Sequence, residues 1–273
     1  MIRLENIYKY YYSESSVTQA LRNVNLEFSK GEFVAITGES GSGKTTLLNV
    51  ISGIDTYDEG EMYVDGEPTF QYDDDDWEEY RRNKIGFVFQ NYNLIGHYTV
   101  LDNIVSALLI LGVSEEDAEK KAVKYLDKVG LKGLEKSRAS KLSSGQKQRL
   151  AIARALAKET DVIMADEPTG NLDEENTINT MSLLRSISKE CLVIVVSHEK
   201  RISKFFADRI IEIQDGQIKK DYKNKATKSY EKADDSNIYL KELSKESIEN
   251  DDFRINIYKD SEHSCNSLKV PIE

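Results

Sequence analysis

Long hydrophobic runs, cysteine frameworks and dense basic segments are all missing from this sequence. The longest strongly apolar stretch, about residues 104–113, is too short to span a bilayer, and the first residues show no signal-peptide pattern. The chain has 2 cysteines, Cys191 and Cys265, whose spacing fits neither a disulfide framework nor a metal site. We therefore expect a soluble, cytoplasmic protein in which Cys191 is a reduced core residue.

Basic charge is also scarce. Of 273 residues, 37 are Lys or Arg and 48 are Asp or Glu, so the formal net charge is −11. A protein that binds duplex nucleic acid needs a basic face to displace counterions, so no nucleic-acid partner is expected. With 39% hydrophobic and 31% charged residues, the chain has the composition of a globular protein with one large domain, alone or with an appendage.

What the sequence does contain is a complete phosphate-binding pattern, G-x-x-x-x-G-K-[ST], known as a P-loop. An apolar, β-branched run at residues 33–37 predicts a strand before it, and apolar residues at helical spacing up to Gly53 predict a helix after it. The predicted nucleotide-binding residues are Gly38, Glu39, Ser40, Gly41, Ser42, Gly43, Lys44, Thr45 and Thr46.

The residue types in this loop suit a magnesium-bound nucleoside triphosphate. Its glycines let the backbone turn so that successive N–H groups point at phosphate oxygens, and the helix adds its positive N-terminal end. Lys44 supplies a positive charge for the β- and γ-phosphates, and the Thr45 hydroxyl is a suitable ligand for Mg²⁺.

Three further predicted strands end in polar residues. These are residues 85–90, ending in Gln90; residues 161–167, ending in Asp166 and Glu167; and residues 192–198, ending in His198. Strands that alternate with helices predict a layered α/β core with a mainly parallel sheet. Ligands bind at the carboxyl ends of the strands in such sheets, so we expect these side chains to lie around the P-loop.

Each of these residues has an expected role in hydrolysis. Asp166 is the predicted carboxylate for Mg²⁺, and Glu167 can orient or deprotonate the attacking water. His198, as a neutral donor, can hold the γ-phosphate and the water, and the amide oxygen of Gln90 can join metal and water. The expected catalytic residues are therefore Glu167, His198, Gln90 and Lys44, and the expected metal ligands are Thr45, Gln90 and Asp166.

The segment 142–149 predicts a second anion-binding helix terminus. Ser143 would cap the helix that runs through Leu156, and Gly145 would allow close approach of another backbone. A generic nucleotide hydrolase does not need this second terminus.

Two other segments have alternative interpretations. The tyrosine-rich run 8–12 fits an edge strand, or it offers a ring for stacking on a nucleobase. The four aspartates 73–76 could suggest a divalent-metal site, but adjacent carboxylates cannot converge on one ion. We expect them to form the N-cap and acidic first turn of a helix.

The sequence resembles the ATP-binding cassette ATPases of ABC transporters over residues 1 to about 220. The matching motifs, in order and spacing, are the P-loop 38–45, Gln90, the signature segment 142–149, residues 166–167, residues 171–173 and His198. Residues 87–94 and 169–173 are similar to the group of macrolide exporters, lipoprotein-release pumps and antimicrobial-peptide resistance pumps. That group also includes a cell-division ATPase.

The resemblance implies a P-loop NTPase core with an antiparallel β subdomain and a helical subdomain at about 91–155. It also implies that two copies dimerise head to tail and that the signature segment of one closes on ATP and Mg²⁺ bound by the other. The helical subdomain and the Gln90 loop would receive a transmembrane permease. The additional nucleotide-contacting residues implied are Tyr11, which would stack on adenine, Ser143, Ser144, Gly145, Gln146, and Asp173 at the dimer interface.

Two residues depart from the family pattern. Ser144 replaces the usual glycine of the signature, and Lys147 replaces a common glutamine. Serine is small and can donate to phosphate, so activity is expected to survive.

The tail 221–273 lies outside the resemblance. It starts as a polar linker, and alternating residues beyond 237 fit either a disordered tail or the strands of a small β-rich extension. The chain could also be the front of a longer ATPase–permease polypeptide.

The expected function is ATP hydrolysis that drives a bacterial permease from the inner face of the membrane. Cargo would be exported or cleared and would be a lipid-like molecule, a drug or a peptide. The alternatives are a cell-division ATPase that regulates without transport and a soluble ATPase that acts on DNA or ribosomes. Long coiled coils or a second cassette would favour the last class, and the sequence shows neither.

Overall fold

The computed structural model describes residues 1–13 and 16–224, together with 237–238, 247–249, 254–256 and 268–269. Contacts divide the chain into two compact units, Met1–Lys228 and Ser229–Glu273. The described part of the second unit has two antiparallel strand pairs, β11 (Asn237–Ile238) with β14 (Leu268–Lys269) and β12 (Ser247–Glu249) with β13 (Arg254–Asn256). The other residues of the predicted tail strands, and Cys265, lie outside the described residues.

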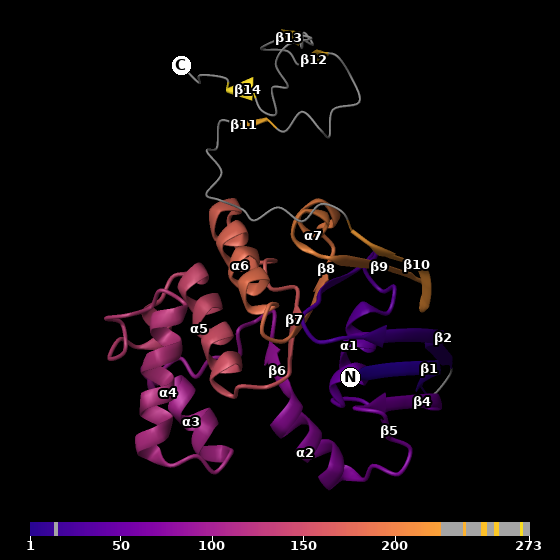
Figure 1. Ribbon diagram of the computed structural model, residues 1–273, viewed down its shortest axis with the longest axis horizontal. Helices are drawn as coiled ribbons and strands as arrows, with labels where there is room; N and C mark the ends of the chain where they lie inside the picture. Colours follow the sequence, from indigo (N-terminus) through magenta and orange to yellow (C-terminus); the bar gives the residue numbers. More distant parts are fainter. Residues whose placement is uncertain (14–15, 225–236, 239–246, 250–253, 257–267, 270–273) are drawn as a thin grey trace. The chain divides into compact units, whose positions relative to one another are not determined.

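The larger unit contains an antiparallel sheet with strand order β2-β1-β4-β5 (Figure 1). Its strands are β1 (Ile2–Tyr12), β2 (Val17–Phe28), β4 (Glu59–Val64) and β5 (Glu67–Pro68). Apolar and polar residues alternate in β1, as expected for a strand with one buried face. Ile2 and Leu4 face the core while Arg3 is exposed, as that alternation requires.

The second sheet is the predicted, mainly parallel one, with strand order β10-β9-β3-β8-β7-β6. Its strands are β3 (Phe33–Thr37), β6 (Ile85–Val88), β7 (Val162–Asp166), β8 (Leu192–Ser197), β9 (Arg209–Gln214) and β10 (Gln217–Lys223). All neighbours pair in parallel except β9 and β10, which form an antiparallel hairpin. Strands β3 and β8 are buried along their whole length, as expected for a parallel sheet covered on both faces. β10 extends beyond the boundary expected near residue 220.

Helices cover both sheets, and Figure 1 shows α3, α4 and α5 together on one side of β6. The helices are α1 (Lys44–Ser52), α2 (Asp74–Lys84), α3 (Asp102–Ile110), α4 (Glu115–Lys128), α5 (Ser144–Ala157), α6 (Glu174–Ile187) and α7 (Lys200–Phe206). α1 contacts β2 of one sheet and β7 and β8 of the other, so its apolar residues belong to a core shared by the two sheets. Within the described residues, no helix is long and apolar enough to cross a membrane.

Local sequence signals set the ends of these helices. Asp73 caps α2 by accepting from the N–H groups of Asp75 and Asp76, so the predicted capping role of the aspartate run is confirmed. Gly53 ends α1 with φ of +68°, and a side chain there would meet the Trp77 ring at 2.5 Å. Cys191 is a free, buried thiol as expected, and burial raises its pKa to about 11.

Candidate functional site

The P-loop connects the end of β3 to the start of α1. Gly43 has φ of +103°, and a Cβ on it would come within 2.8 Å of the Ala20 carbonyl oxygen. A Cβ on Gly38 would come within 2.4 Å of the Ile213 carbonyl oxygen, so neither glycine tolerates a side chain. Lys44 is only 7% exposed, and its ammonium donates to the carbonyl oxygens of Gly38 and Glu39 at 3.0 and 2.8 Å. The loop therefore holds the ammonium group of Lys44 against its own main-chain carbonyl oxygens.

Asp166 ends β7 beside this loop. Its pKa is raised by burial and by the neighbouring Glu167 charge, against an opposing hydrogen bond from the Thr45 hydroxyl and the charge of Lys44. One carboxylate oxygen, Oδ1, is buried and has no hydrogen-bond partner. A hydroxyl and a carboxylate are the oxygen ligands that Mg²⁺ prefers, and the unpartnered Oδ1 gives such an ion a place to bind. The residues present therefore fit a magnesium ion.

Glu167 follows Asp166 and is held by the neighbouring strand. Its amide donates to the carbonyl oxygen of Val196 in β8 at 3.0 Å, and its carboxylate Oε2 lies 2.8 Å from Nδ1 of His198. The Glu167 side chain is 15% exposed, whereas that of His198 is 61% exposed. Glu167 has φ of +46°, a conformation that costs free energy for a residue with a side chain. The structure thus brings together the two predicted catalytic residues at the ends of β7 and β8.

Gln90 does not end a strand, because β6 stops at Val88. Gln90 lies instead in an exposed turn, and its carbonyl oxygen accepts from the Asn171 side chain at 3.4 Å. This contact ties the Gln90 turn to the loop after β7. The strand therefore ends two residues before Gln90, and the expected position of Gln90 at a strand end is wrong. The hydrogen bond from Asn171 nevertheless joins Gln90 to the loop that follows β7.

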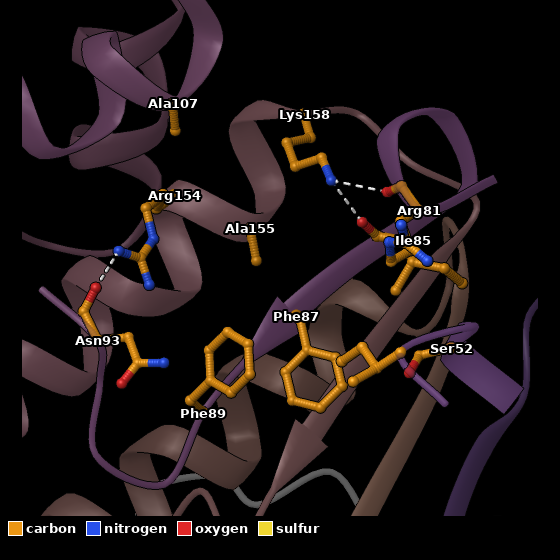
Figure 2. Close-up of a pocket in the computed structure, with 11 residues that line it drawn as sticks. Ser52, Arg81, Ile85, Phe87, Phe89, Asn93, Ala107, Arg154, Ala155 and Lys158 are labelled. Atoms are coloured by element: carbon orange, nitrogen blue, oxygen red, sulfur yellow. Dashed lines mark hydrogen bonds between the residues drawn. The ribbon is translucent and has the colours of Figure 1, made fainter. Parts of the chain in front are cut away.

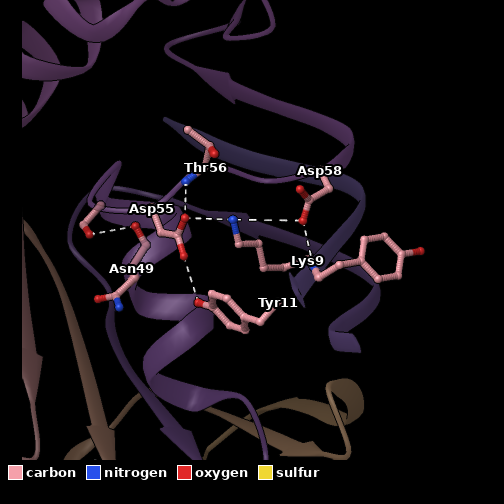
Figure 3. Close-up of polar contacts among 8 residues, drawn as sticks. Lys9, Tyr11, Asn49, Asp55, Thr56 and Asp58 are labelled. Atoms are coloured by element: carbon pink, nitrogen blue, oxygen red, sulfur yellow. Dashed lines mark hydrogen bonds and ion pairs between the residues drawn. The ribbon is translucent and has the colours of Figure 1, made fainter. Parts of the chain in front are cut away.

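Tyr11 lies at the end of β1, where pairing with β4 has stopped after Tyr8 and only β2 pairs with it. β1 is an inner strand of its sheet, so the edge-strand interpretation is wrong for the strand as a whole, although the residues after Tyr8 pair with β2 alone. Stacking of Tyr11 on a nucleobase stays a prediction. The Tyr11 hydroxyl donates to the carboxylate of Asp55 at 2.8 Å, in the loop after α1 (Figure 3). The ammonium of Lys9 donates to the other Asp55 oxygen at 2.8 Å and is 7% exposed. Burial raises the pKa of Asp55, but these two hydrogen bonds, the charge of Lys9 and the Thr56 N–H together outweigh it, so the pKa is lowered.

The signature segment begins α5 as predicted. Ser143 caps the helix by accepting from the Gln146 N–H, and the Gln146 side chain accepts from the Ser143 N–H in return. Gly145 is buried, and a Cβ on it would meet Oδ1 of Asn176 at 2.0 Å. Asn176 in turn donates to both carboxylate oxygens of Asp173, which caps α6. No motif of the sequence pointed to Asn176, although it joins the signature glycine to Asp173.

Figure 1 shows α1 and α5 on opposite sides of β7. The P-loop at the start of α1 and the signature at the start of α5 therefore belong to helices that the sheet separates. Each is a helix N-terminus with polar residues or glycine, and each has the character of an anion-binding terminus.

The comparison with known families decides what kind of protein carries these motifs. Residues 21–170 match the model of the ABC transporter family. The chain belongs to the ABC transporter family of ATP-binding proteins. The P-loop α/β core with a mainly parallel sheet, expected for an ATP-binding cassette, is thereby confirmed.

Individual relatives support this assignment. An uncharacterised ABC transporter ATP-binding protein of Methanocaldococcus jannaschii is 42% identical over 229 residues, which cover 82% of this chain and 97% of the relative. The macrolide export ATP-binding/permease protein of Mannheimia succiniciproducens is 40% identical over 219 residues, which cover 80% of this chain. The chain spans 34% of the length of that exporter, about a third.

A solved structure is similar over the same region. It is a dimeric structure of a post-hydrolysis state of an ATP-binding cassette bound to ADP and phosphate, with TM-score 0.75 and 39% identity. The similarity covers 83% of this chain and 100% of that one.

Proposed function

We propose that the cassette binds and hydrolyses ATP with Mg²⁺ and that hydrolysis drives a membrane permease. The observation that carries the proposal is the group at the ends of β3, β7 and β8. There a buried P-loop lysine, a carboxylate with an unpartnered buried oxygen and a Glu–His pair lie on adjacent strands. A structurally similar cassette was solved with ADP and phosphate, which supports this choice of nucleotide.

The P-loop residues would bind the triphosphate. Lys44 exchanges its bonds to two loop carbonyl oxygens for bonds to β- and γ-phosphate oxygens, which are stronger acceptors. Thr45 and Asp166 would hold Mg²⁺, which neutralises charge on the phosphates when bound. The loop N–H groups and the start of α1 stabilise the remaining negative charge.

Glu167 and His198 would act on the attacking water. Glu167 accepts a hydrogen bond from the water and takes its proton as the oxygen attacks the γ-phosphorus. The bond from the γ-phosphorus to the bridging oxygen breaks in the same step, and that oxygen leaves with ADP. The bond from His198 orients the Glu167 carboxylate, and the strained backbone of Glu167 fixes where that carboxylate can point. Positioning of this kind, rather than covalent chemistry, is the main source of rate in phosphoryl transfer.

The signature segment would act on the nucleotide of a second copy. The sheet separates α5 from α1, so the two helix termini belong to different sides of one chain. A head-to-tail pair would place each signature against the other copy's P-loop, with Ser143, Ser144, Gly145 and Gln146 closing on the γ-phosphate. The dimeric state of the similar structure supports this arrangement.

The partner would be a permease, and the cassette would act at the inner face of the membrane through it. The exporter relative is an ATP-binding/permease protein, which supports this partner. By the same similarity the cargo would be a lipid-like molecule, a drug or a peptide. In such an assembly, the permease would contact the cargo.

A phosphate-release assay on the full chain tests the proposal. The wild type should release phosphate from ATP only when Mg²⁺ is present, and Lys44→Ala should lower the rate at least about a hundredfold. Lys120→Ala, at an exposed position on α4, is the matched control and should behave as wild type. Metal-independent release, or full activity of Lys44→Ala, would contradict the proposed site.

A further inference from the structure

Lys9 is a buried cation beside an exposed tyrosine ring. It lies on β1 and is 7% exposed, whereas Tyr11, two residues further along the strand, is 41% exposed. The ammonium of Lys9 donates to Oδ1 of Asp55 at 2.8 Å and lies 4.0 Å from Oδ2 of Asp58. Both carboxylates come from the short loop between α1 and β4, so one side chain of β1 joins the strand to that loop (Figure 3).

The two carboxylates of this loop depend on the cation between them. Oδ1 of Asp55 also accepts from the Thr56 N–H at 2.8 Å, and Oδ2 of Asp58 accepts from the Tyr10 N–H at 2.6 Å. Both carboxylates lie within 4.0 Å of a single ammonium, so they are close enough to repel each other. Lys9 offsets this repulsion. Without it, we expect the Asp55 carboxylate to turn toward water.

The order that Lys9 imposes on Asp55 extends to Tyr11. The second Asp55 oxygen accepts from the Tyr11 hydroxyl at 2.8 Å. Burial and this hydrogen bond raise the pKa of Tyr11, so the hydroxyl stays protonated and remains a donor. The side chain of Thr46, in the first turn of α1, acts on the same hydroxyl in the opposite direction, so the ring lies beside the predicted phosphate-binding loop. Two consecutive bonds therefore connect Lys9, Asp55 and Tyr11.

Lys9 also lies against the Tyr11 ring itself. Its Nζ is 5.4 Å from the ring centroid, over one face. A cation within about 6 Å of a ring centroid is attracted to the face of that ring. The ring is thus held at its hydroxyl and on one face, which leaves the opposite face for another flat group. A ring that is already held loses little conformational freedom when such a group stacks on it.

We propose that Lys9 is a positioning residue that fixes the Tyr11 ring for stacking on the nucleotide base. Lys9 acts through Asp55 and through the ring, and it makes no contact with the nucleotide. The inference rests on the proposed function, because it specifies how the cassette holds the base of the ATP that it hydrolyses.

A base held in this way is selected by its ring area. The Tyr11 hydroxyl has one hydrogen, which Asp55 accepts, so Tyr11 offers no donor to the edge of a base. Stacking tolerates any base, and a purine covers more of the tyrosine ring than a pyrimidine does. Loss of Lys9 should therefore weaken ATP most, CTP less, and tripolyphosphate, which has no base, not at all. A merely structural role of Lys9 would weaken all three ligands alike, because they share the phosphate-binding loop.

Calorimetry on the full chain, with Mg²⁺ chelated so that ATP stays intact, measures the three dissociation constants. We expect Lys9→Met to raise the Kd for ATP about fivefold and that for CTP about twofold, and to leave the Kd for tripolyphosphate unchanged. Lys9→Gln, which also removes the charge, serves if Lys9→Met does not fold. An unchanged Kd for ATP, or an equal loss for the three ligands, would overturn the inference.

A second lysine that joins two carboxylates provides the matched control. Lys84 contacts Asp65 at 2.9 Å and Asp161 at 3.1 Å, and it directly precedes β6, at the end of the sheet away from the predicted nucleotide site. Lys84→Met should bind all three ligands as the wild type does. The same graded loss in Lys84→Met would show that the effect does not depend on Tyr11 and would contradict the inference.

A Tyr11→Ala background tests the route directly. There, Lys9→Met should not change the Kd for ATP any further, because the ring that it positions is gone. A further fivefold loss would show that Lys9 acts without Tyr11 and would overturn the inference. In steady-state phosphate release with Mg²⁺, Lys9→Met alone should raise the KM for ATP and leave kcat unchanged. A lowered kcat with an unchanged KM would contradict a role confined to the base.

The wild type separates this inference from the proposed function. A wild type that binds neither ATP nor tripolyphosphate contradicts the proposed function. A wild type that binds both, with the same Kd for ATP in Lys9→Met, contradicts only the positioning role of Lys9.

Discussion

The carboxylate of Glu167 accepts a hydrogen bond from Nδ1 of His198 at 2.8 Å, which joins the ends of β7 and β8. A carboxylate can only accept, so Nδ1 carries the hydrogen and a neutral ring has only a lone pair left at Nε2. The sequence predicted His198 as a neutral donor to the γ-phosphate. In this arrangement its donor is committed to Glu167, and we propose that His198 orients that carboxylate. Its contact with the γ-phosphate stays a prediction.

Removing His198 should therefore act through Glu167. We expect His198→Ala to lower kcat about a hundredfold or more, because the carboxylate loses its orientation. Glu167→Gln should lower it further, and adding His198→Ala to Glu167→Gln should have little extra effect. Steady-state phosphate release for the two single variants and the double variant measures this. Multiplicative effects of the two substitutions would show that the residues act independently.

The bond between Tyr11 and Asp55 should set the affinity for the base but not for the phosphates. We expect Asp55→Asn and Tyr11→Phe each to raise the Kd for ATP about fivefold, because the exposed ring loses its anchor to the loop after α1. Affinity for inorganic tripolyphosphate, measured by calorimetry, should stay unchanged. Tyr10→Phe is the matched control, because that hydroxyl binds Glu59 instead. Equal loss of affinity for tripolyphosphate would contradict a role confined to the base.

Gly145 should tolerate no side chain. In Gly145→Ala the new methyl would lie 2.0 Å from Oδ1 of Asn176, so Asn176 must leave the Asp173 cap. We expect a loss of about 1–2 kcal/mol in the free energy of unfolding, measured by urea denaturation. Adding Asn176→Ala should recover part of it. Gly96→Ala is the control, since its nearest neighbour is 3.8 Å away, and a similar loss there would contradict this explanation.

Lys158 should make stability depend on pH. Burial lowers its pKa from 10.5 to about 8, so between these values the unfolded chain binds more protons and stability rises with pH. Below pH 8, Lys158 is protonated in both the folded and the unfolded chain, so the free-energy cost of burying its charge is fully present. Relative to Lys158→Met, the wild type should therefore gain about 1–2 kcal/mol between pH 8 and 10.5, allowing for partial exposure. The free energies of unfolding are measured by urea denaturation, and a difference between the two proteins that does not change with pH would contradict this. Lys120→Met is the control.

Much of the fold could be predicted because strong local patterns agree with the tertiary structure. The apolar run 33–37 became the fully buried β3, and the Ser143–Gln146 pair became a capping box at the start of α5. The acidic run at Asp73 became a helix cap for the same reason. Such signals lie within a few residues of each other, so the sequence shows them directly.

Other features depend on contacts that local patterns do not contain. α6 was not delimited, because its first turn is acidic and polar and two of the side chains that it buries are the polar Thr177 and Thr180. β6 ends before Gln90, where the chain turns to meet the loop after β7. Arg81 of α2, Arg154 of α5 and Lys158, which directly follows α5, line one pocket (Figure 2), and only the folded chain shows this grouping.

In the proposed dimer, the P-loop of one chain is half of a site that the signature segment of a second copy completes. Glu167→Gln should bind ATP without hydrolysing it, so the closed pair should accumulate. Light scattering coupled to gel filtration should then show the mass double from the 31.1 kDa of one chain when ATP is added, and return on exchange to ADP. A variant that is saturated with ATP and remains at the mass of one chain would contradict a nucleotide site shared between two copies.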